Sequence, residues 1–401
     1  MANVAGSLPD VVAGQAAKSV RGLARLRLIT GYVLMLVSLV GLFGADWDIQ
    51  WHAVIGRDRT FTPPHDMILA SIGLAGIVAL VSILVETRWA ARTSELRRYG
   101  TDFLGILHSS LGSYLVGFGA VCSAVAFPLD TYWHSLYGVD VSLWAPFHTM
   151  IYMGGVLSTF GIIYMLLSAA HLAQEQQDRK TALFSYAGVV ALLGMLLSKF
   201  STFLTPAISG HALPLASLSV SLFPFLLALA AVFVCVLAAR LLPWTGAATM
   251  AVVVYLLVWL LVSAFVHPMM TLLVQVEHQT YLARASRIGS NIVAMLGQTP
   301  FLLLLSLSID GVAWLGRRGK WTLSRLKKWV FTASTISMFF VAGLTLVQIA
   351  LSLRTGQSSG GGAGGHIGLA FLLALILTIP GSLIGGWLSL AISDTLQTLR
   401  R

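Results

Sequence analysis

Residues 46–66 read DWDIQWHAVIGRDRTFTPPHD and lie between two long apolar segments. This stretch contains four aspartates, two arginines and two histidines, and lipid does not accept so many polar groups unless they have partners. Within it, Asp48, His52 and His65 follow the spacing Asp-x3-His-x12-His. Asp48 and His52 are one helical turn apart and therefore share a helix face. Two prolines then break the helix, which lets the chain return with His65.

A second copy of this pattern spans residues 130–150, which read DTYWHSLYGVDVSLWAPFHTM. Asp130, His134 and His148 repeat the triad with the spacing Asp-x3-His-x13-His. Both copies also keep a Trp-His pair, a Gly-x-Asp and a Pro-x-His-x-Met. A repeat that keeps all of these features is hard to attribute to chance. We therefore expect two similar sites, one in each copy, at neighbouring positions.

The composition is that of a membrane protein. Of 401 residues, 57% are hydrophobic and 10% are charged, and the mean hydropathy is +0.84. These values predict an all-α polytopic membrane helix bundle in the lipid bilayer and exclude catalysis by a large water-exposed domain. The net charge of +10 does not indicate nucleic acid, because the basic residues sit in short loops beside apolar spans. Cys122 and Cys235 fall inside apolar runs, so we expect neither a disulfide framework nor a thiolate metal site.

Apolar runs long enough to cross a bilayer predict about ten transmembrane helices. They are expected at about 28–45, 67–85, 103–126, 149–170, 182–198, 217–239, 247–266, 289–308, 329–352 and 367–393.

Most lysines and arginines, including six in residues 317–328, fall in alternate connecting segments. By the positive-inside rule, these segments and both termini are cytoplasmic. Most histidines fall on the other side, so the chain is predicted to be a multi-pass cell-membrane protein with its metal motifs toward the extracytoplasmic side.

The chain divides into three parts on this interpretation. Residues 1–27 form a polar, basic segment that is read as a retained cytoplasmic N-terminus. Residues 28–170 form a four-helix unit with the duplicated motif, and residues 171–401 contribute further transmembrane helices of unassigned role. Residues 267–288 are interpreted as an interfacial or re-entrant helix, and residues 355–365 as a flexible linker. Asp310 is expected in a loop beside the basic run 317–328, which serves as a topology anchor.

Two imidazoles and one carboxylate form a nitrogen-rich ligand set that suits copper, zinc or iron(II) and leaves positions open for water, oxygen or substrate. Calcium and magnesium prefer oxygen ligands and are disfavoured. Candidates to orient the imidazoles through hydrogen bonds are Asp46, Asp58, Asp66 and Asp140, with Arg57 as an ion-pair partner. Aromatic side chains that form either a wall around the sites or an interfacial belt are Trp47, Trp51, Tyr132, Trp133, Tyr137 and Trp144.

The alternative to metal binding is a hydrogen-bonded cluster of the same six side chains that stabilises two helix breaks. Two matched triads favour a metal over this alternative. Four other histidines are interpreted as hydrogen-bonded or interfacial side chains rather than metal ligands: His211, His267, His278 and His366.

The first motif resembles the copper-binding membrane subunit of the copper membrane monooxygenases, the particulate methane and ammonia monooxygenases. The resemblance covers about residues 28–170 and rests on Trp51-His52, Val54, Arg57-Asp58, Phe61-Thr62-Pro63 and His65. It implies copper ligation by Asp48, His52 and His65 at one site, and by Asp130, His134 and His148 at a second. The family's second site begins with an asparagine, whereas this chain has Asp130 at the matching position. Residues 171–401 contain no counterpart of the family's other membrane subunit.

The resemblance implies a copper-dependent monooxygenase, with one or two copper sites, that activates dioxygen to hydroxylate a small apolar substrate. In that case all six triad residues are catalytic. The sequence has no flavin, haem or NAD motif, so a separate electron donor or copper-supplying subunit is expected, and the resemblance suggests a homotrimer. Two alternatives remain. One is a non-catalytic membrane metal-binding protein for copper handling, sensing or transport. The other is a structural scaffold that uses the repeat only as a folding unit.

Overall fold

The computed structural model describes residues 8–55, 60–137, 144–204, 212–215, 218–280, 300–355 and 367–398. Nine helices in these ranges are long and apolar enough to cross a membrane. Eight of them belong to α1 (Leu8–Val54), α2 (Pro63–Arg92), α3 (Leu111–Tyr137), α4 (Pro146–Glu175), α5 (Arg179–Leu204), α7 (Phe223–Leu241), α8 (Ala247–Val276) and α12 (Leu323–Thr355). The ninth combines most of α13 (Ile367–Ile376) with α14 (Thr378–Thr398). The chain is therefore an all-α, multi-pass membrane protein, as its composition predicts.

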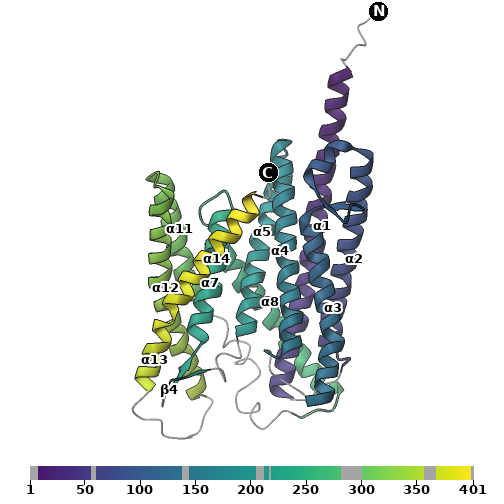
Figure 1. Cartoon of the computed structure of the whole chain (residues 1–401). Helices are drawn as coiled ribbons and strands as arrows, with labels where there is room; N and C mark the ends of the chain where they lie inside the picture. The colour runs from purple at the N-terminus through teal and green to yellow at the C-terminus, as the bar shows by residue number, and fades with distance from the viewer. Residues whose placement is uncertain are drawn as a thin grey trace, which may run out of the picture.

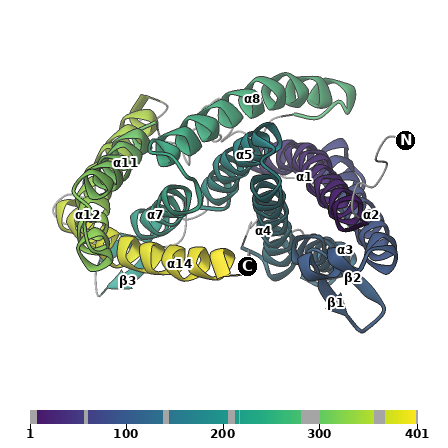
Figure 2. The same ribbon diagram turned by 90° about the horizontal axis from the view of Figure 1, so that it is seen from above.

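The helices form two groups joined through α4 and α5 (Figure 1, Figure 2). Helices α1 to α4 form the first group, in which consecutive helices pack against each other. The second group contains α7, α12, α14 and α11 (Leu302–Arg318). Helix α8 runs along one side of both groups and contacts α1, α5, α7 and α11. The largest buried cluster draws mainly on α4, α5 and α7, so the motif-bearing helix α4 shares its core with later helices.

Small residues bring α3 and α4 into backbone contact. A Cβ added at Gly119 would collide with the carbonyl oxygen of Gly154, and the reverse also holds. The Ser123 hydroxyl donates to the Ile151 carbonyl across the same interface, at 2.9 Å. Close approach of small residues with interhelical hydrogen bonds is typical of helix packing in lipid. This contact fixes the separation of the two helices that carry the second triad.

Helix α1 begins at Leu8 and therefore extends about 70 Å. Residues 8–27 of the predicted polar N-terminal segment are thus helical, continuous with the first span.

Arg27, which the sequence places in the basic segment before the first span, is instead buried at 1% exposure. Its guanidinium donates to both carboxylate oxygens of Glu86, at 3.2 and 2.7 Å, and to the Tyr99 carbonyl at 2.8 Å. The backbone N–H of Ser110 also donates to Glu86, at 3.0 Å. This network joins α1 to α2 and to the segment that connects α2 with α3.

Other boundaries differ from the sequence prediction. The expected span at 103–126 begins with a hairpin, β1 (Thr101–Phe103) and β2 (Leu107–Ser109), which pair antiparallel. A second hairpin, β3 (Ala212–Leu215) and β4 (Leu218–Ser221), precedes α7. A 3-10 turn, η1 (Ser94–Tyr99), follows α2. These short strands lie in connections and leave the fold all-α.

The interpretation of residues 267–276 as a separate interfacial helix is wrong, because α8 continues through Pro268 to Val276. Asp310 is likewise not a loop residue. It lies in α11, is 8% exposed, and accepts hydrogen bonds from the backbone N–H groups of Ala248 and Thr249 at 3.2 and 2.8 Å. A carboxylate there satisfies free donors at the N-terminus of α8. Of the span expected at 289–308, residues 289–299 lie outside the described residues, so the count of ten remains a prediction.

We expect Glu86→Gln to lower the free energy of unfolding by about 3 kcal/mol, because it leaves the Arg27 charge buried without its counter-ion. The measurement is the apparent melting temperature of the purified protein in detergent. Arg25→Gln is the matched control, since Arg25 is 66% exposed and its distance to Asp178 is 3.8 Å. An equal loss of stability in both variants would show that the buried ion pair has no special role.

Candidate metal centre

The first triad forms where α1 ends and α2 begins. Asp48 and His52 lie in the last two turns of α1. Thr62 is the N-cap of α2, and its hydroxyl accepts from the backbone N–H of His65 at 3.4 Å. Prolines occupy the first two positions of α2, where their missing N–H groups cost nothing. The cap and the prolines therefore start the new helix with His65 in its first turn.

The three side chains of the first triad converge on one carboxylate oxygen. Asp48 Oδ1 lies 3.4 Å from His52 Nε2 and 3.0 Å from His65 Nε2. The exposed fractions of the three side chains are 18%, 9% and 13%. The site is therefore mostly shielded from solvent, and the carboxylate oxygen faces both imidazoles.

The hydrogen bond on the far side of His65 determines which ring nitrogen carries the proton. His65 Nδ1 lies 3.2 Å from the backbone carbonyl oxygen of Thr60, and a carbonyl can only accept. Nδ1 therefore carries the proton, and in a neutral imidazole Nε2 presents a lone pair to Asp48 Oδ1. Two acceptors at this separation repel each other unless a cation or an extra proton lies between them. A carbonyl on the outer nitrogen is also the usual arrangement around a metal-bound histidine.

The second triad repeats the arrangement between α3 and α4. Asp130 and His134 lie in the last two turns of α3, and His148 lies in the first turn of α4, which begins with Pro146. Asp130 Oδ2 is 3.3 Å from His134 Nε2 and 3.1 Å from His148 Nε2. Asp130 Oδ1 is buried without a hydrogen bond in the described structure, which is costly for a carboxylate that no cation compensates.

The separations in both triads fit a metal ion. Metal–nitrogen and metal–oxygen bonds of about 2.0–2.1 Å place neighbouring ligand atoms roughly 2.9–3.4 Å apart, depending on the angle between the bonds. The carboxylate–imidazole distances fall between 3.0 and 3.4 Å. In each triad one ligand atom per residue lies within 4.8 Å of the other two. Two groups of side chains can therefore hold a metal ion.

The two triads lie at the same end of neighbouring helices. The His65 ring contacts Phe127 edge to face, with 5.8 Å between ring centroids. Phe127 lies on α3, three residues before Asp130. The duplicated motifs are thus neighbours in space, as the repeat predicts. The membrane side that they face remains a prediction.

The predicted surroundings of the triads are only partly as expected. Asp46 accepts a hydrogen bond from the Thr202 hydroxyl at 3.0 Å rather than orienting an imidazole. Asp66 is exposed at the start of α2.

The aromatic side chains near the triads have mixed environments. Trp47 and Trp51 are buried in a cluster with α8 residues, and the Trp144 indole donates to the Phe203 carbonyl at 2.9 Å. Tyr132 and Tyr137 are exposed, as a belt requires, and the Trp133 ring contacts Tyr137. Arg57, Asp58 and Asp140 lie outside the described residues.

The other histidines that the structure describes do not join the triads. His108 is 2.9 Å from Asp102 in the first hairpin, and this hydrogen bond lowers the pKa of Asp102. His171 pairs with Glu175 within α4. His267 is exposed on α8, and His278 follows its end. His211 and His366, together with residues 356–365 of the linker, lie outside the described residues.

Sequence reasoning missed a partly buried lysine in α5. The Lys199 ammonium donates to the Ser38 hydroxyl and the Thr159 hydroxyl, each at 2.9 Å, and to the Gly155 carbonyl at 3.3 Å. An ammonium has three donors, and three neutral oxygens from α1 and α4 accept them. The expected span ends at residue 198, one position before this lysine. The sequence feature that could have revealed Lys199 is its position as a lone lysine between Leu197 and Phe200, in an otherwise apolar run.

Comparisons of the chain with models of protein families, with curated proteins and with solved structures found no match in any of the three.

We expect the protein to bind two equivalents of a transition metal, and Asp48→Asn and Asp130→Asn each to remove one, because each substitution removes the anionic ligand of one triad. Metal content after loading and dialysis, measured by elemental mass spectrometry, tests this. Asp66→Asn is the matched control, because it removes an exposed carboxylate next to His65. Unchanged metal content in both triad variants would contradict the assignment.

Metal retention is also expected to fall as the pH drops below about 6.5, because protons compete for the imidazole nitrogens. Titration of the loaded protein with acid, followed by the same metal analysis, checks the expectation. Retention that stays constant down to about pH 5 would point to ligands other than histidine.

Proposed function

We propose that this protein is an integral-membrane, copper-dependent monooxygenase-like enzyme that uses dioxygen to hydroxylate a small apolar substrate. The observation that carries the proposal is the convergence of two matched Asp-His-His triads at one end of an apolar helix bundle. The reaction class, hydroxylation with dioxygen, is taken from the resemblance of residues 51–65 to the copper membrane monooxygenases. The catalytic role of all six triad residues is part of this proposal.

The donor set supports copper. Each triad offers two imidazole nitrogens and one carboxylate oxygen, which leaves part of the coordination sphere open for an external ligand. Copper has the highest affinity among the divalent first-row metals for such ligands. Zinc binds the same donors but has no redox chemistry, and iron(II) also fits a set of two histidines and one carboxylate. Bound copper would supply one-electron redox chemistry toward dioxygen.

The protein's own residues orient the ligands and limit access. The Thr60 carbonyl holds the His65 proton on Nδ1, so Nε2 stays available as a ligand. Asp48 and Asp130 each face two imidazoles and supply the negative charge that favours a bound cation. Large apolar side chains on the neighbouring turns, including Phe61, Leu129 and Leu136, are exposed. This apolar surface supports the approach of an apolar substrate from the lipid.

The proposed reaction requires electrons from a separate donor, because the sequence has no flavin, haem or NAD motif. The experiment uses copper-loaded protein in lipid nanodiscs, a quinol reductant, a short-chain alkane and isotopically labelled oxygen gas. We expect labelled oxygen in the product. Asp48→Asn or Asp130→Asn should lower product formation on the order of tenfold or more, whereas Asp66→Asn should not. Equal turnover in the metal-free protein would refute the proposal.

A non-catalytic role in copper transport is the second candidate, and the Lys199 cluster bears on it. A partly buried polar cluster between α1, α4 and α5 is the kind of feature that marks a translocation pathway. However, the positive charge of Lys199 opposes the passage of a cation along that route. Copper uptake into vesicles separates the two candidates. Copper uptake by the vesicles, without oxygen incorporation in the first assay, would favour transport.

A further inference from the structure

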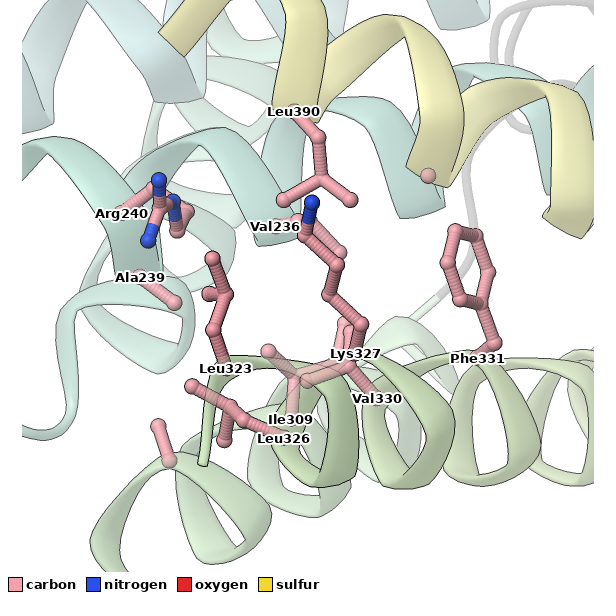
Figure 3. Close-up of a pocket in the computed structure, with 12 residues that line it drawn as sticks. Val236, Ala239, Arg240, Ile309, Leu323, Leu326, Lys327, Val330, Phe331 and Leu390 are labelled. Carbon is pink, nitrogen blue, oxygen red and sulfur yellow. The ribbon is translucent and has the colours of Figure 1, made fainter. Parts of the chain in front are cut away.

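A pocket lies among the helices of the second group, at the opposite end of the bundle from the triads. It has a volume of about 50 Å³ and lies between α7, α11, α12 and α14 (Figure 3). Most of its lining is apolar, from side chains that include Val236, Ile309, Leu326, Phe331 and Leu390. Its two charged lining residues are both cationic, Arg240 and Lys327. The pocket therefore combines an apolar interior with positive charge.

The two cations have different environments. Arg240 donates to Asp394 at 2.6 Å. Lys327 has no hydrogen bond and no ion pair among the described residues. In Figure 3 its side chain extends from α12 toward α14, into the pocket whose lining is mostly apolar. An ammonium against apolar side chains is unfavourable unless water or an anion accompanies it. Lys327 therefore has the capacity to bind an external anion.

The basic segment beside the pocket has no counter-charge of its own. Residues 317–328 contain six lysines and arginines and no acidic residue. Arg317 donates to the carbonyls of Pro243 and Trp244, both at 3.3 Å. Arg318 and Arg325 stack over tryptophan rings. These partners are neutral, and in the described part of the chain no residue of this segment forms an ion pair. The local positive charge therefore favours an anion from outside the protein.

The position of the pocket fits a lipid. Arg240 lies in the last turn of α7, and Lys327 lies near the start of α12. Helix ends in a membrane protein lie at the depth of the headgroups, while the apolar lining continues toward the hydrocarbon. Basic pockets between transmembrane helices are a known way to hold anionic headgroups. A soluble phosphate would match the charge but would leave the apolar lining without a partner.

We propose that this pocket binds one anionic phospholipid, with its phosphate at Lys327 and Arg240 and an acyl chain against the apolar lining. The bound lipid would join α7, α11, α12 and α14, which meet there. Its headgroup would neutralise charge that no carboxylate of the basic segment balances. The proposal concerns the second group of helices and is independent of the chemistry at the triads.

The test compares phosphatidylglycerol with phosphatidylcholine, lipids that share acyl chains and differ in net charge. Delipidated protein in neutral detergent is titrated with each, and bound lipid is counted by native mass spectrometry. We expect one tightly retained phosphatidylglycerol and a higher melting temperature with this lipid than with phosphatidylcholine. Lys327→Gln should weaken retention about fivefold, whereas Lys327→Arg should retain it. Inorganic phosphate alone should give no stabilisation.

Lys328→Gln is the matched control, because Lys328 is the neighbour of Lys327, has the same charge and does not line the pocket. Equal loss of lipid in Lys327→Gln and Lys328→Gln would reduce the effect to general surface charge and overturn the proposal. Equal retention of phosphatidylcholine and phosphatidylglycerol, or stabilisation by inorganic phosphate alone, would also overturn it.

Discussion

Charged groups within an apolar bundle require partners, and this constraint determines where the helices of this protein meet. Arg27 and Glu86 neutralise each other and join α1 to α2. Asp310 satisfies free N–H groups at the start of α8 and joins it to α11. Lys199 joins α5 to α1 and α4 through three neutral oxygens. The triads differ from these contacts, because in each triad one carboxylate oxygen faces two imidazole nitrogens.

The fold class and the candidate sites were predictable because their signals are local. A mean hydropathy of +0.84 predicts membrane helices without knowledge of how they pack. The spacing of Asp48, His52 and His65 places all three ligands at one helix break, and the second copy of the motif repeats that geometry. Each triad therefore depends on helix periodicity and on prolines in the following helix, both of which are visible in the sequence.

The incorrect predictions concern residues whose role depends on distant partners. Arg27 looks like any arginine before a span, and only the approach of Glu86 from α2 explains its burial. Asp310 looks like a loop residue because it precedes a basic run, but its partners are 61 and 62 positions away. Helix α8 continues through Pro268 because proline in a membrane helix is tolerated where neighbouring groups compensate. Pairings of this kind cannot be read from one segment alone.

Each triad is complete within a single helical hairpin. Asp48 and His65 are 17 positions apart, and Asp130 and His148 are 18 positions apart. The entropy cost of bringing the ligands together is therefore that of a short loop. A metal site can consequently assemble as soon as its own pair of helices has been inserted, before the later helices leave the ribosome. In biogenesis, a captured ion would then act as an early cross-link that sets the register of α1 against α2 and of α3 against α4.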